Sequence, residues 1–423
     1  MATAFGLDKP QLTITPVDGP LNGRVTPPGS KSITNRALLL AALAKGTSHL
    51  TGALKSVDTK LMAEALRAMG VTIDEPDDTS FIVTSTGRLE APEAPLALGN
   101  AGTAMRFLTA AVTLVQGTVV VDGDQHMRKR PIGPLVEALR SIGISASDAS
   151  GYPPVIVHGN GAFGSGRVEI DGGLSSQYVS ALLMAAAFGN GPIEVALTGS
   201  EIGARGYVDL TIAAMRAFGA QVEQIDAASW RVQPTGYTAT DYVIEPDASA
   251  ATYLWAAEVL TGGGIDLGVA SDAFTQPDAK AREVIAQFPH LPAVIDGSQM
   301  QDAIPTIAVL AAFNETPVRF VGIANLRVKE CDRVAAVATE LSRIRPGLGT
   351  EEGDDLIVAS DPKLAGQVLP TRITTYSDHR IAMSFALAGL KIGGITILDP
   401  GCVAKTYPTY WEAMRSLGVE LVE

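Results

Sequence analysis

The chain has 423 residues, 46% of them hydrophobic and only 5% aromatic, so it can bury a large core spread over two or three domains. Its formal charge of −13 argues against a nucleic-acid partner, because a surface that binds phosphates needs an excess of Lys and Arg. The sequence shows neither a signal peptide nor an uninterrupted apolar run of about 18 residues, and its two cysteines, Cys331 and Cys402, fit neither a disulfide framework nor a zinc motif. We therefore expect a cytoplasmic protein with no membrane partner.

One pattern occurs six times along the chain: a short polar or cationic cluster, an alanine- and leucine-rich helix, a turn and a β-branched run. In chain order, the clusters that open the six predicted helices lie at residues 32–36, 102–106, 176–177, 249–250, 304–306 and 379–380. A helix N-terminus presents unpaired N–H groups at the positive end of its dipole, so each cluster is a candidate anion site. The pattern predicts an anionic substrate contacted by several helix N-termini.

A second recurring signal is a helix that ends in a basic residue, a hydrophobic residue and a glycine. It occurs at Gly70, Gly143, Gly219 and Gly418. The first three are roughly 75 residues apart, longer than most solenoid repeats, and the last interval leaves room for two degenerate copies, near Phe288 and residues 345–347. We interpret each copy as a small unit containing a βαβ motif in a pseudo-symmetric array. The alternative is that each glycine is an independent helix C-cap.

Two changes in composition divide the chain. A turn-rich stretch ends at residues 27–29, and the polar residues 238–241 separate two strand-like runs. Three repeats fit between these points and three follow. We therefore predict a double crossover, with residues 28–242 forming an N-terminal domain and residues 1–27 plus 243–423 forming a C-terminal domain, joined by a hinge.

Several clusters carry chemistry suited to anions. Residues 28–32 resemble a P-loop, but the glycines are not where that motif requires them; what remains is a turn that delivers Lys31 and Ser32 to a helix start, with Arg36 on the same face. Glycines at residues 99 and 102 allow the backbone to approach a ligand closely. For residues 28–32 a capped surface helix is the alternative.

Further cationic and polar groups follow. Pro131 fixes the chain directly after Arg130, which favours a positioned guanidinium. The three polar residues 175–177 precede an apolar helix, and capping explains only one of them. Lys329 and Arg333 share a helix face beside residue 330, where a salt-bridge network is the alternative interpretation.

Together these segments resemble those of the enolpyruvyl transferase family over nearly the whole chain. The segments that carry the resemblance are residues 29–32, 98–106, 130–133, 175–177, 327–330 and 378–380. The resemblance implies an α/β fold of two pseudo-symmetric domains, each of three βαβαββ repeats in an inside-out α/β barrel, with the active site in the interdomain cleft. It also implies transfer of the enolpyruvyl group of phosphoenolpyruvate to the 5-hydroxyl of shikimate 3-phosphate by addition–elimination, releasing phosphate, in the route to chorismate and the aromatic amino acids.

The resemblance assigns roles residue by residue. It implies that Lys31, Asp302 and Glu330 are catalytic, with Asp302 taking the 5-hydroxyl proton and Glu330 in the acid region that protonates the methylene carbon. The implied shikimate 3-phosphate ligands are Lys31, Ser32, Arg36, Ser175, Ser176, Gln177, Asp302, Asn325 and Lys329. The implied phosphoenolpyruvate ligands are Lys31, Gly102, Arg130, Gln177, Arg333, Arg380 and Lys405. Because an acid and a base suffice for this chemistry, we expect no metal or cofactor.

Three departures from the family pattern bear on affinity rather than on the reaction. Phe107 stands where many bacterial members have proline, Ala204 stands where a serine often holds the shikimate phosphate, with Arg205 as a substitute beside it, and Pro305 lies close to Asp302. One alternative function is the sister reaction on UDP-N-acetylglucosamine, which is disfavoured because residues 124–131 contain no cysteine; another is non-catalytic binding of a phosphorylated metabolite. We expect a monomer that is inhibited by glyphosate.

Overall fold

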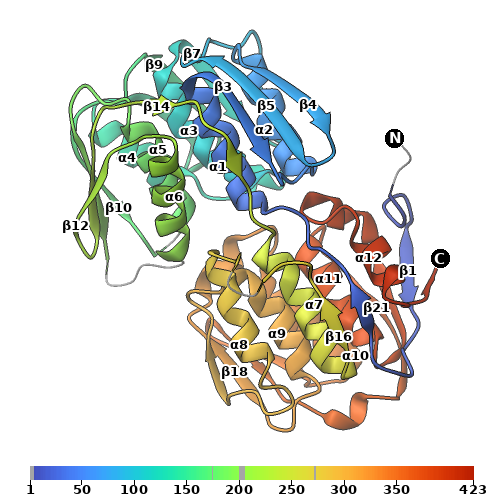
Figure 1. Ribbon diagram of the computed structural model, residues 1–423. Coiled ribbons are helices and arrows are strands. Elements are labelled where there is room, and N and C mark those ends of the chain that lie inside the picture. The colour runs from blue at the N-terminus through green and yellow to red at the C-terminus, as the bar shows by residue number, and fades with distance from the viewer. Residues whose placement is uncertain (1–3, 174, 200–204, 271–272) are drawn as a thin grey trace. The chain divides into compact units, whose positions relative to one another are not determined.

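The computed structural model describes residues 4–173, 175–199, 205–270 and 273–423. The chain divides into two compact units, which Figure 1 shows: unit 1 comprises Met1–Pro28 and Pro246–Glu423, and unit 2 comprises Gly29–Glu245. The chain therefore passes from one unit to the other twice. The second passage follows residue 245, three residues beyond the expected boundary at 242. Within the described residues, no helix is long and apolar enough to cross a membrane.

Unit 2 contains six α-helices and three sheets in its described part. The helices are α1 (Lys31–Leu43), α2 (Val57–Ala68), α3 (Gly102–Ala111), α4 (Gly133–Ser141), α5 (Ser176–Ala186) and α6 (Arg205–Ala217). The first sheet has the strand order β14 (Tyr237–Thr238), β3 (Ala44–Thr51), β5 (Ser80–Thr86) and β4 (Thr72–Asp77), with β15 (Tyr242–Val243) also paired to β3. The second has the order β6 (Leu96–Ala97), β7 (Gln116–Asp122), β9 (Tyr152–Asn160) and β8 (Ser145–Ala149). The third has the order β10 (Gly166–Asp171), β11 (Ile193–Thr198), β13 (Ser229–Val232) and β12 (Val222–Asp226).

Each sheet of unit 2 combines parallel pairing with an antiparallel hairpin; in the first sheet both β14 and β15 are parallel to β3. In the second sheet β6 is parallel to β7, with Leu96 opposite Val121, and β9 is antiparallel to both β7 and β8. A parallel pair requires a crossover connection, which α3 provides, and α4 leads to the hairpin. The same order recurs with α5 and α6 in the third sheet. The predicted βαβαββ repeat is confirmed.

Unit 1 follows the same plan with one reduced copy. Its α-helices are α7 (Ala248–Thr261), α8 (Ala281–Ile285), α9 (Ile304–Ala311), α10 (Arg333–Ile344), α11 (His379–Gly389) and α12 (Tyr410–Ser416). One sheet has the strand order β17 (Val294–Asp296), β18 (Val318–Val321), β20 (Asp355–Val358) and β19 (Gly349–Glu352). Another has the order β21 (Val368–Ile373), β22 (Gly393–Leu398), β1 (Gln11–Ile14) and β23 (Leu421–Val422). In a third, two-stranded sheet, β16 (Gly264–Asp266) pairs with β2 (Asn22–Arg24). The reduced copy is the one with the five-residue α8 and the two-stranded sheet, near the predicted degenerate repeat.

The first helix of each repeat lies at the centre of its unit. Helix α1 is buried along almost its whole length because residues 37–43 are apolar without interruption, and α3 and α5 are buried in the same way. In unit 1 the corresponding helices are α7, α9 and α11. Each unit has its own hydrophobic core. At about 25 cal/mol per Å² of buried apolar surface, these inner helices supply much of the stabilisation.

The glycine signal marks the ends of four second helices. Gly70, Gly143, Gly219 and Gly418 follow α2, α4, α6 and α12, with φ of +87°, +86°, +86° and +93°. A residue with a Cβ is strained in this left-handed conformation, so glycine ends each helix at the same point of the repeat.

Candidate active site

The inner helices of unit 2 begin with uncharged caps. The Oγ of Ser30 accepts a hydrogen bond from the backbone N–H of Ile33 at 3.3 Å, and the Oγ of Ser175 accepts one from Gln177 at 3.2 Å. Helix α3 begins after Ala101, which offers no side-chain cap. None of these caps is an anion, so no capping carboxylate compensates the positive ends of the three helix dipoles.

Two cations lie on α1 of unit 2. Lys31 is its first residue, with Nζ 3.7 Å from the carboxylate of Asp58 and its side chain 12% exposed. Arg36 is fully buried one turn further on, and burial lowers its pKa to about 10. It therefore stays charged at neutral pH.

Protein groups use most of the hydrogen-bond donors of Arg36. Its Nε donates to Thr211 Oγ1 at 2.7 Å, its Nη1 to the carbonyl of Ser32 at 2.8 Å, and its Nη2 to Ser180 Oγ at 3.2 Å. The guanidinium carbon also lies 5.1 Å from the ring centre of Phe107 on α3. Arg36 thus contributes a buried positive charge and fixes the first turn of α1.

The start of α3 lies against a second arginine. Arg130 Nη1 donates to Asn100 Oδ1 at 3.0 Å, and a Cβ placed on Gly102 would lie 2.6 Å from Arg130 Nη2. Gln177 Nε2 donates to Thr103 Oγ1 at 3.2 Å, so the first turns of α3 and α5 are joined. Ser176, the first residue of α5, is buried. The predicted ligands of unit 2 on α3 and α5 therefore lie in one neighbourhood.

In unit 1 the predicted residues form one ion-pair network. Arg333, the first residue of α10, lies 3.0 Å from Asp302, 2.7 Å from Glu330 and 2.8 Å from Asp378. Arg380 Nη2 lies 2.9 Å from the other oxygen of Asp302. Both guanidinium groups are buried, and the neighbouring carboxylates raise both pKa values although burial opposes this.

The remaining predicted residues of unit 1 adjoin this network. Lys405 Nζ, at the end of η8 (Pro400–Lys405), lies 3.7 Å from Glu330. Asn325 lies in η6 (Ala324–Val328) and donates to Gln301, which precedes Asp302 in η5 (Gln301–Ala303). Lys329 directly follows η6. Among the described residues, no group of three or more His, Cys, Asp or Glu side chains is arranged to hold a metal ion.

Three of the six described α-helices of unit 1 begin with an acidic cap. Asp247 caps α7, Asp332 caps α10 and Asp378 caps α11, each accepting a backbone N–H at 2.9 to 3.0 Å. At α7, the buried Asp278 also accepts a hydrogen bond from Ser249 at 2.6 Å. The protein's own carboxylates therefore compensate the dipole of α7, contrary to the prediction that residues 249–250 open an external anion site.

Several residues that make these contacts are not among the predicted site residues. Asp58 pairs with Lys31, Asp378 pairs with Arg333, and Thr103 joins two helix starts. The signal for Asp378 was available in the sequence, because an Asp directly before a polar helix start is a typical N-cap. No local signal marked Asp58, whose partner lies 27 positions away in the chain.

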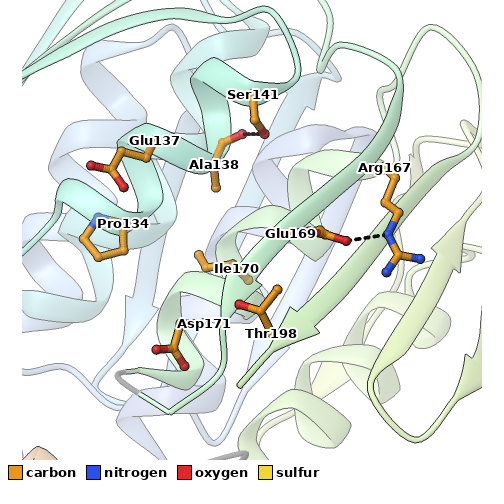
Figure 2. Close-up of a pocket in the computed structure, with 9 residues that line it drawn as sticks. All are labelled: Pro134, Glu137, Ala138, Ser141, Arg167, Glu169, Ile170, Asp171 and Thr198. Carbon is orange, nitrogen blue, oxygen red and sulfur yellow. Dashed lines mark hydrogen bonds and ion pairs between the residues drawn. The ribbon is translucent and has the colours of Figure 1, made fainter. Parts of the chain in front are cut away.

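A separate pocket of unit 2 contains none of the predicted ligands. Its volume is about 550 Å³, and Figure 2 shows the side chains that line it, from α4, β10 and the end of β11. The single Arg among them, Arg167, lies 2.9 Å from Glu169 within the pocket, and Glu137 and Asp171 add further negative charge. This pocket is therefore poorly suited to anionic substrates.

Comparison with known proteins decides the family. A family model described as EPSP synthase (3-phosphoshikimate 1-carboxyvinyltransferase) matches residues 17–414. The chain belongs to the EPSP synthase family. It is 73% identical over 409 residues to the 3-phosphoshikimate 1-carboxyvinyltransferase of Rhizobium etli (strain CFN 42), covering 97% of each chain. It is 70% identical over 415 residues to that of Pseudomonas syringae pv. syringae (strain B728a), covering 98% of this chain and 99% of the relative.

Solved structures agree with the family assignment. An EPSP synthase from Acinetobacter baumannii matches with a TM-score of 0.78 at 26% identity, over 98% of this chain and 100% of that one. The enolpyruvyl transferase NikO from Streptomyces tendae matches with a TM-score of 0.74 at 18% identity, over 97% and 98% of the two chains, and shows the shared fold. EPSP synthases transfer the enolpyruvyl group of phosphoenolpyruvate to shikimate 3-phosphate in the shikimate pathway, and the sister reaction on an amino sugar is not favoured.

The three residues that depart from the EPSP synthase pattern lie in different structural surroundings. Phe107 is fully buried and faces Arg36. Pro305 lies in the first turn of α9, where its missing N–H has no helical partner to lose. Ala204 lies outside the described residues, and the neighbouring Arg205 donates to the carbonyl of Ala227.

Proposed function

We propose that the predicted ligands of the two units act together in the enolpyruvyl transfer from phosphoenolpyruvate to shikimate 3-phosphate. Unit 2 supplies most shikimate 3-phosphate ligands through the starts of α1 and α5, together with Gly102 and Arg130 for phosphoenolpyruvate. Unit 1 supplies the base, the acid and the other phosphoenolpyruvate ligands. Lys31 and Gln177 serve both substrates. The uncharged helix caps of unit 2 support this division, because they leave the helix dipoles available to phosphate.

The observation that carries the proposal is the network of Asp302, Glu330, Arg333, Arg380 and Lys405. It holds two carboxylates and three cations within ion-pair distance of one another. A reaction that adds a proton at one carbon and removes one from a hydroxyl needs an acid and a base held beside groups that bind a polyanion. This network supplies the acid, the base and the cations that bind the polyanion.

The proton movements follow from these roles. Glu330 acts in its protonated, carboxylic acid form: it protonates the methylene carbon and so gives positive character at C2 of phosphoenolpyruvate, and the 5-hydroxyl oxygen adds there as Asp302 takes its proton. This forms a tetrahedral adduct that still carries the phosphate. The Glu330 carboxylate then takes back a methyl proton while the C2–O bond to phosphate breaks, and Asp302 returns its proton to the departing phosphate; these movements restore the double bond and release phosphate. Arg333, Arg380 and Lys405 offset the negative charge throughout.

The direct test is phosphate release with purified protein. Phosphate is expected only when phosphoenolpyruvate and shikimate 3-phosphate are both present, and mass spectrometry is expected to find the enolpyruvyl ether. An Arg167→Gln variant, changed in the pocket of Figure 2, is the control and is expected to retain turnover. Binding of both substrates without any phosphate release would support the non-catalytic alternative instead.

Three finer proposals accompany this function. We place the enzyme in the cytoplasm, where its two free cysteines stay reduced. We propose that it acts as a monomer, which light scattering coupled to size-exclusion chromatography can check. We also propose that glyphosate competes with phosphoenolpyruvate for the cations around Gly102 and Arg333.

A further inference from the structure

Arg327 has no role in the reaction proposed above, yet each nitrogen of its guanidinium is bonded. Its Nε donates to Asp354 Oδ1 at 2.8 Å, and its Nη2 donates to the carbonyl of Gly353 at 2.6 Å. Its Nη1 donates to both Asp332 and Glu351 at 2.8 Å. The side chain is 24% exposed. The side chain of Arg327 is therefore held in one place by four protein groups.

These partners belong to two parts of unit 1. Glu351, Gly353 and Asp354 form the end of the β19–β20 hairpin. Asp332 caps α10 by accepting the N–H of Ala335. Arg327 thus joins the hairpin to residues 325–333, here termed the acid segment because it carries Glu330.

The acid segment carries four predicted site residues: Asn325, Lys329, Glu330 and Arg333. Its other described side-chain contacts include those of Asn325 with Gln301 and of Glu330 with Arg333 and Lys405. Cys331 and Arg333 also contact Asp378. Of these residues, Glu330, Arg333 and Lys405 are themselves proposed to meet the substrates. The contacts of Arg327 involve no predicted ligand, so substrate binding does not compete with them.

We propose that Arg327 is a positioning residue, which holds the acid segment against the β19–β20 hairpin so that Lys329 and Glu330 keep their places when substrates bind. The inference rests on the proposed function. A single exposed ion pair contributes little, but a planar guanidinium with every nitrogen bonded fixes direction as well as distance. Lysine has no such planar fork, so Arg327→Lys restores the charge but not the geometry.

Arg319 provides a matched control. It lies on β18 and pairs with the same hairpin, with Nε 2.8 Å from Asp355 and Nη1 2.8 Å from Glu352. None of its described bonds reaches the acid segment. Arg319→Gln therefore removes an equivalent pair of hairpin contacts and leaves the segment attached.

The first test compares Arg327→Gln with Arg319→Gln in steady-state kinetics and thermal unfolding. We expect Arg327→Gln to lower kcat at least tenfold and to raise KM for shikimate 3-phosphate, with both variants losing similar amounts of thermal stability. We expect Arg327→Lys to recover part of the kcat, and Arg319→Gln to stay within about twofold of the parent. Equal kcat for Arg327→Gln and Arg319→Gln in folded protein would overturn the proposal.

A second readout does not depend on activity. Hydrogen exchange followed by mass spectrometry should show faster exchange of residues 325–333 in Arg327→Gln and unchanged exchange there in Arg319→Gln. Parent protein without turnover would refute the proposed function, while the exchange data would still decide the positioning role. If Arg327→Gln does not fold, Asp354→Asn removes one partner from the hairpin side; we expect faster exchange of the segment, and unchanged exchange would refute the role.

Discussion

The carboxylate of Asp302 lies between two guanidinium groups, 3.0 Å from Arg333 Nη1 and 2.9 Å from Arg380 Nη2. Two cations at these distances stabilise the ionised carboxylate and weaken it as a proton acceptor. In the reaction proposed here, the anionic groups of phosphoenolpyruvate pair with both arginines. Asp302 then loses its counter-ions and becomes a better base when the substrate has bound.

Asp302→Asn tests this role. Loss of the base should lower kcat by roughly 10² to 10⁴-fold, while shikimate 3-phosphate binding, measured by calorimetry, should change only a few-fold. Asp361→Asn, which removes the partner of Arg345 elsewhere in unit 1, is the control for a lost ion pair. Retained turnover with the parental pH dependence would exclude Asp302 as the base.

Gly102→Ala tests the phosphoenolpyruvate position at α3. Gly102 is the first residue of the helix and is not among the glycines with positive φ, so alanine is compatible with its backbone. The added Cβ would lie 2.6 Å from Arg130 Nη2 and 2.9 Å from Arg106 Nη1 and would displace them. We expect a higher KM for phosphoenolpyruvate and weaker inhibition by glyphosate, with shikimate 3-phosphate affinity nearly unchanged.

The stability of the Gly102→Ala variant distinguishes a functional glycine from a structural one. Alanine favours helix by up to about 1 kcal/mol over glycine, which offsets part of the crowding, so the unfolding midpoint should barely move. Gly191→Ala is the control, because a Cβ there would meet nothing within 4 Å. Normal phosphoenolpyruvate kinetics together with a large loss of stability would show that Gly102 is required for packing alone.

Among elements, α1 and α3 are coupled through Arg36 and Phe107. The guanidinium carbon lies 5.1 Å from the ring centre, and Arg36 in turn holds the carbonyl of Ser32. A cation over a desolvated ring gains about 2 kcal/mol. Phenylalanine at this position therefore supports the start of α1 from the neighbouring helix.

Phe107→Leu should weaken this support. We expect the Kd of shikimate 3-phosphate to rise about threefold to tenfold, because the first turn of α1 is held less firmly. Phe163→Leu, at an equally buried ring of unit 2, controls for the lost volume, and both variants should lose similar thermal stability. Equal affinities in the two variants would show that Phe107 acts only as a core residue.

Helix starts were predictable from the sequence, whereas the pairing of side chains was not. Each of the six predicted helix starts lies within one residue of the first residue of an inner helix. A polar cluster directly before an uninterrupted apolar run leaves little freedom in placing the cap. The pairing of Arg36 with Thr211 joins positions 175 apart, and that of Arg380 with Asp302 joins positions 78 apart. Such partners are set by packing of separate elements, which no local pattern records.

Across the whole molecule, the repeat predicted the order of elements but not every strand partner. Strand β2 precedes α1 in the chain yet pairs with β16 of unit 1, and β15 precedes α7 yet pairs with β3 of unit 2. Each of these strands therefore pairs with a strand that is distant in the sequence but belongs to the same unit. A repeat period gives the number of repeats along the chain and contains no information about such distant pairings.

These pairings leave unit 2 as one continuous segment with complete sheets. Its ends adjoin each other, since the N–H of Ser30 donates to the carbonyl of Glu245 at 2.9 Å, and its core consists only of its own residues. A fragment of residues 29–245 should therefore unfold in a single cooperative transition on heating. It should also bind shikimate 3-phosphate, more weakly than the full chain, because Asn325 and Lys329 belong to unit 1.

Calorimetry on the fragment checks the binding, with Lys31→Met in the fragment as the matched control. We expect the control to fold but to bind less tightly, since it removes a cation from the start of α1 and leaves the helix cap in place. No turnover is expected from the fragment, because Asp302 and Glu330 are absent. A folded fragment that binds phosphoenolpyruvate but not shikimate 3-phosphate would reverse the proposed division of substrates between the two units.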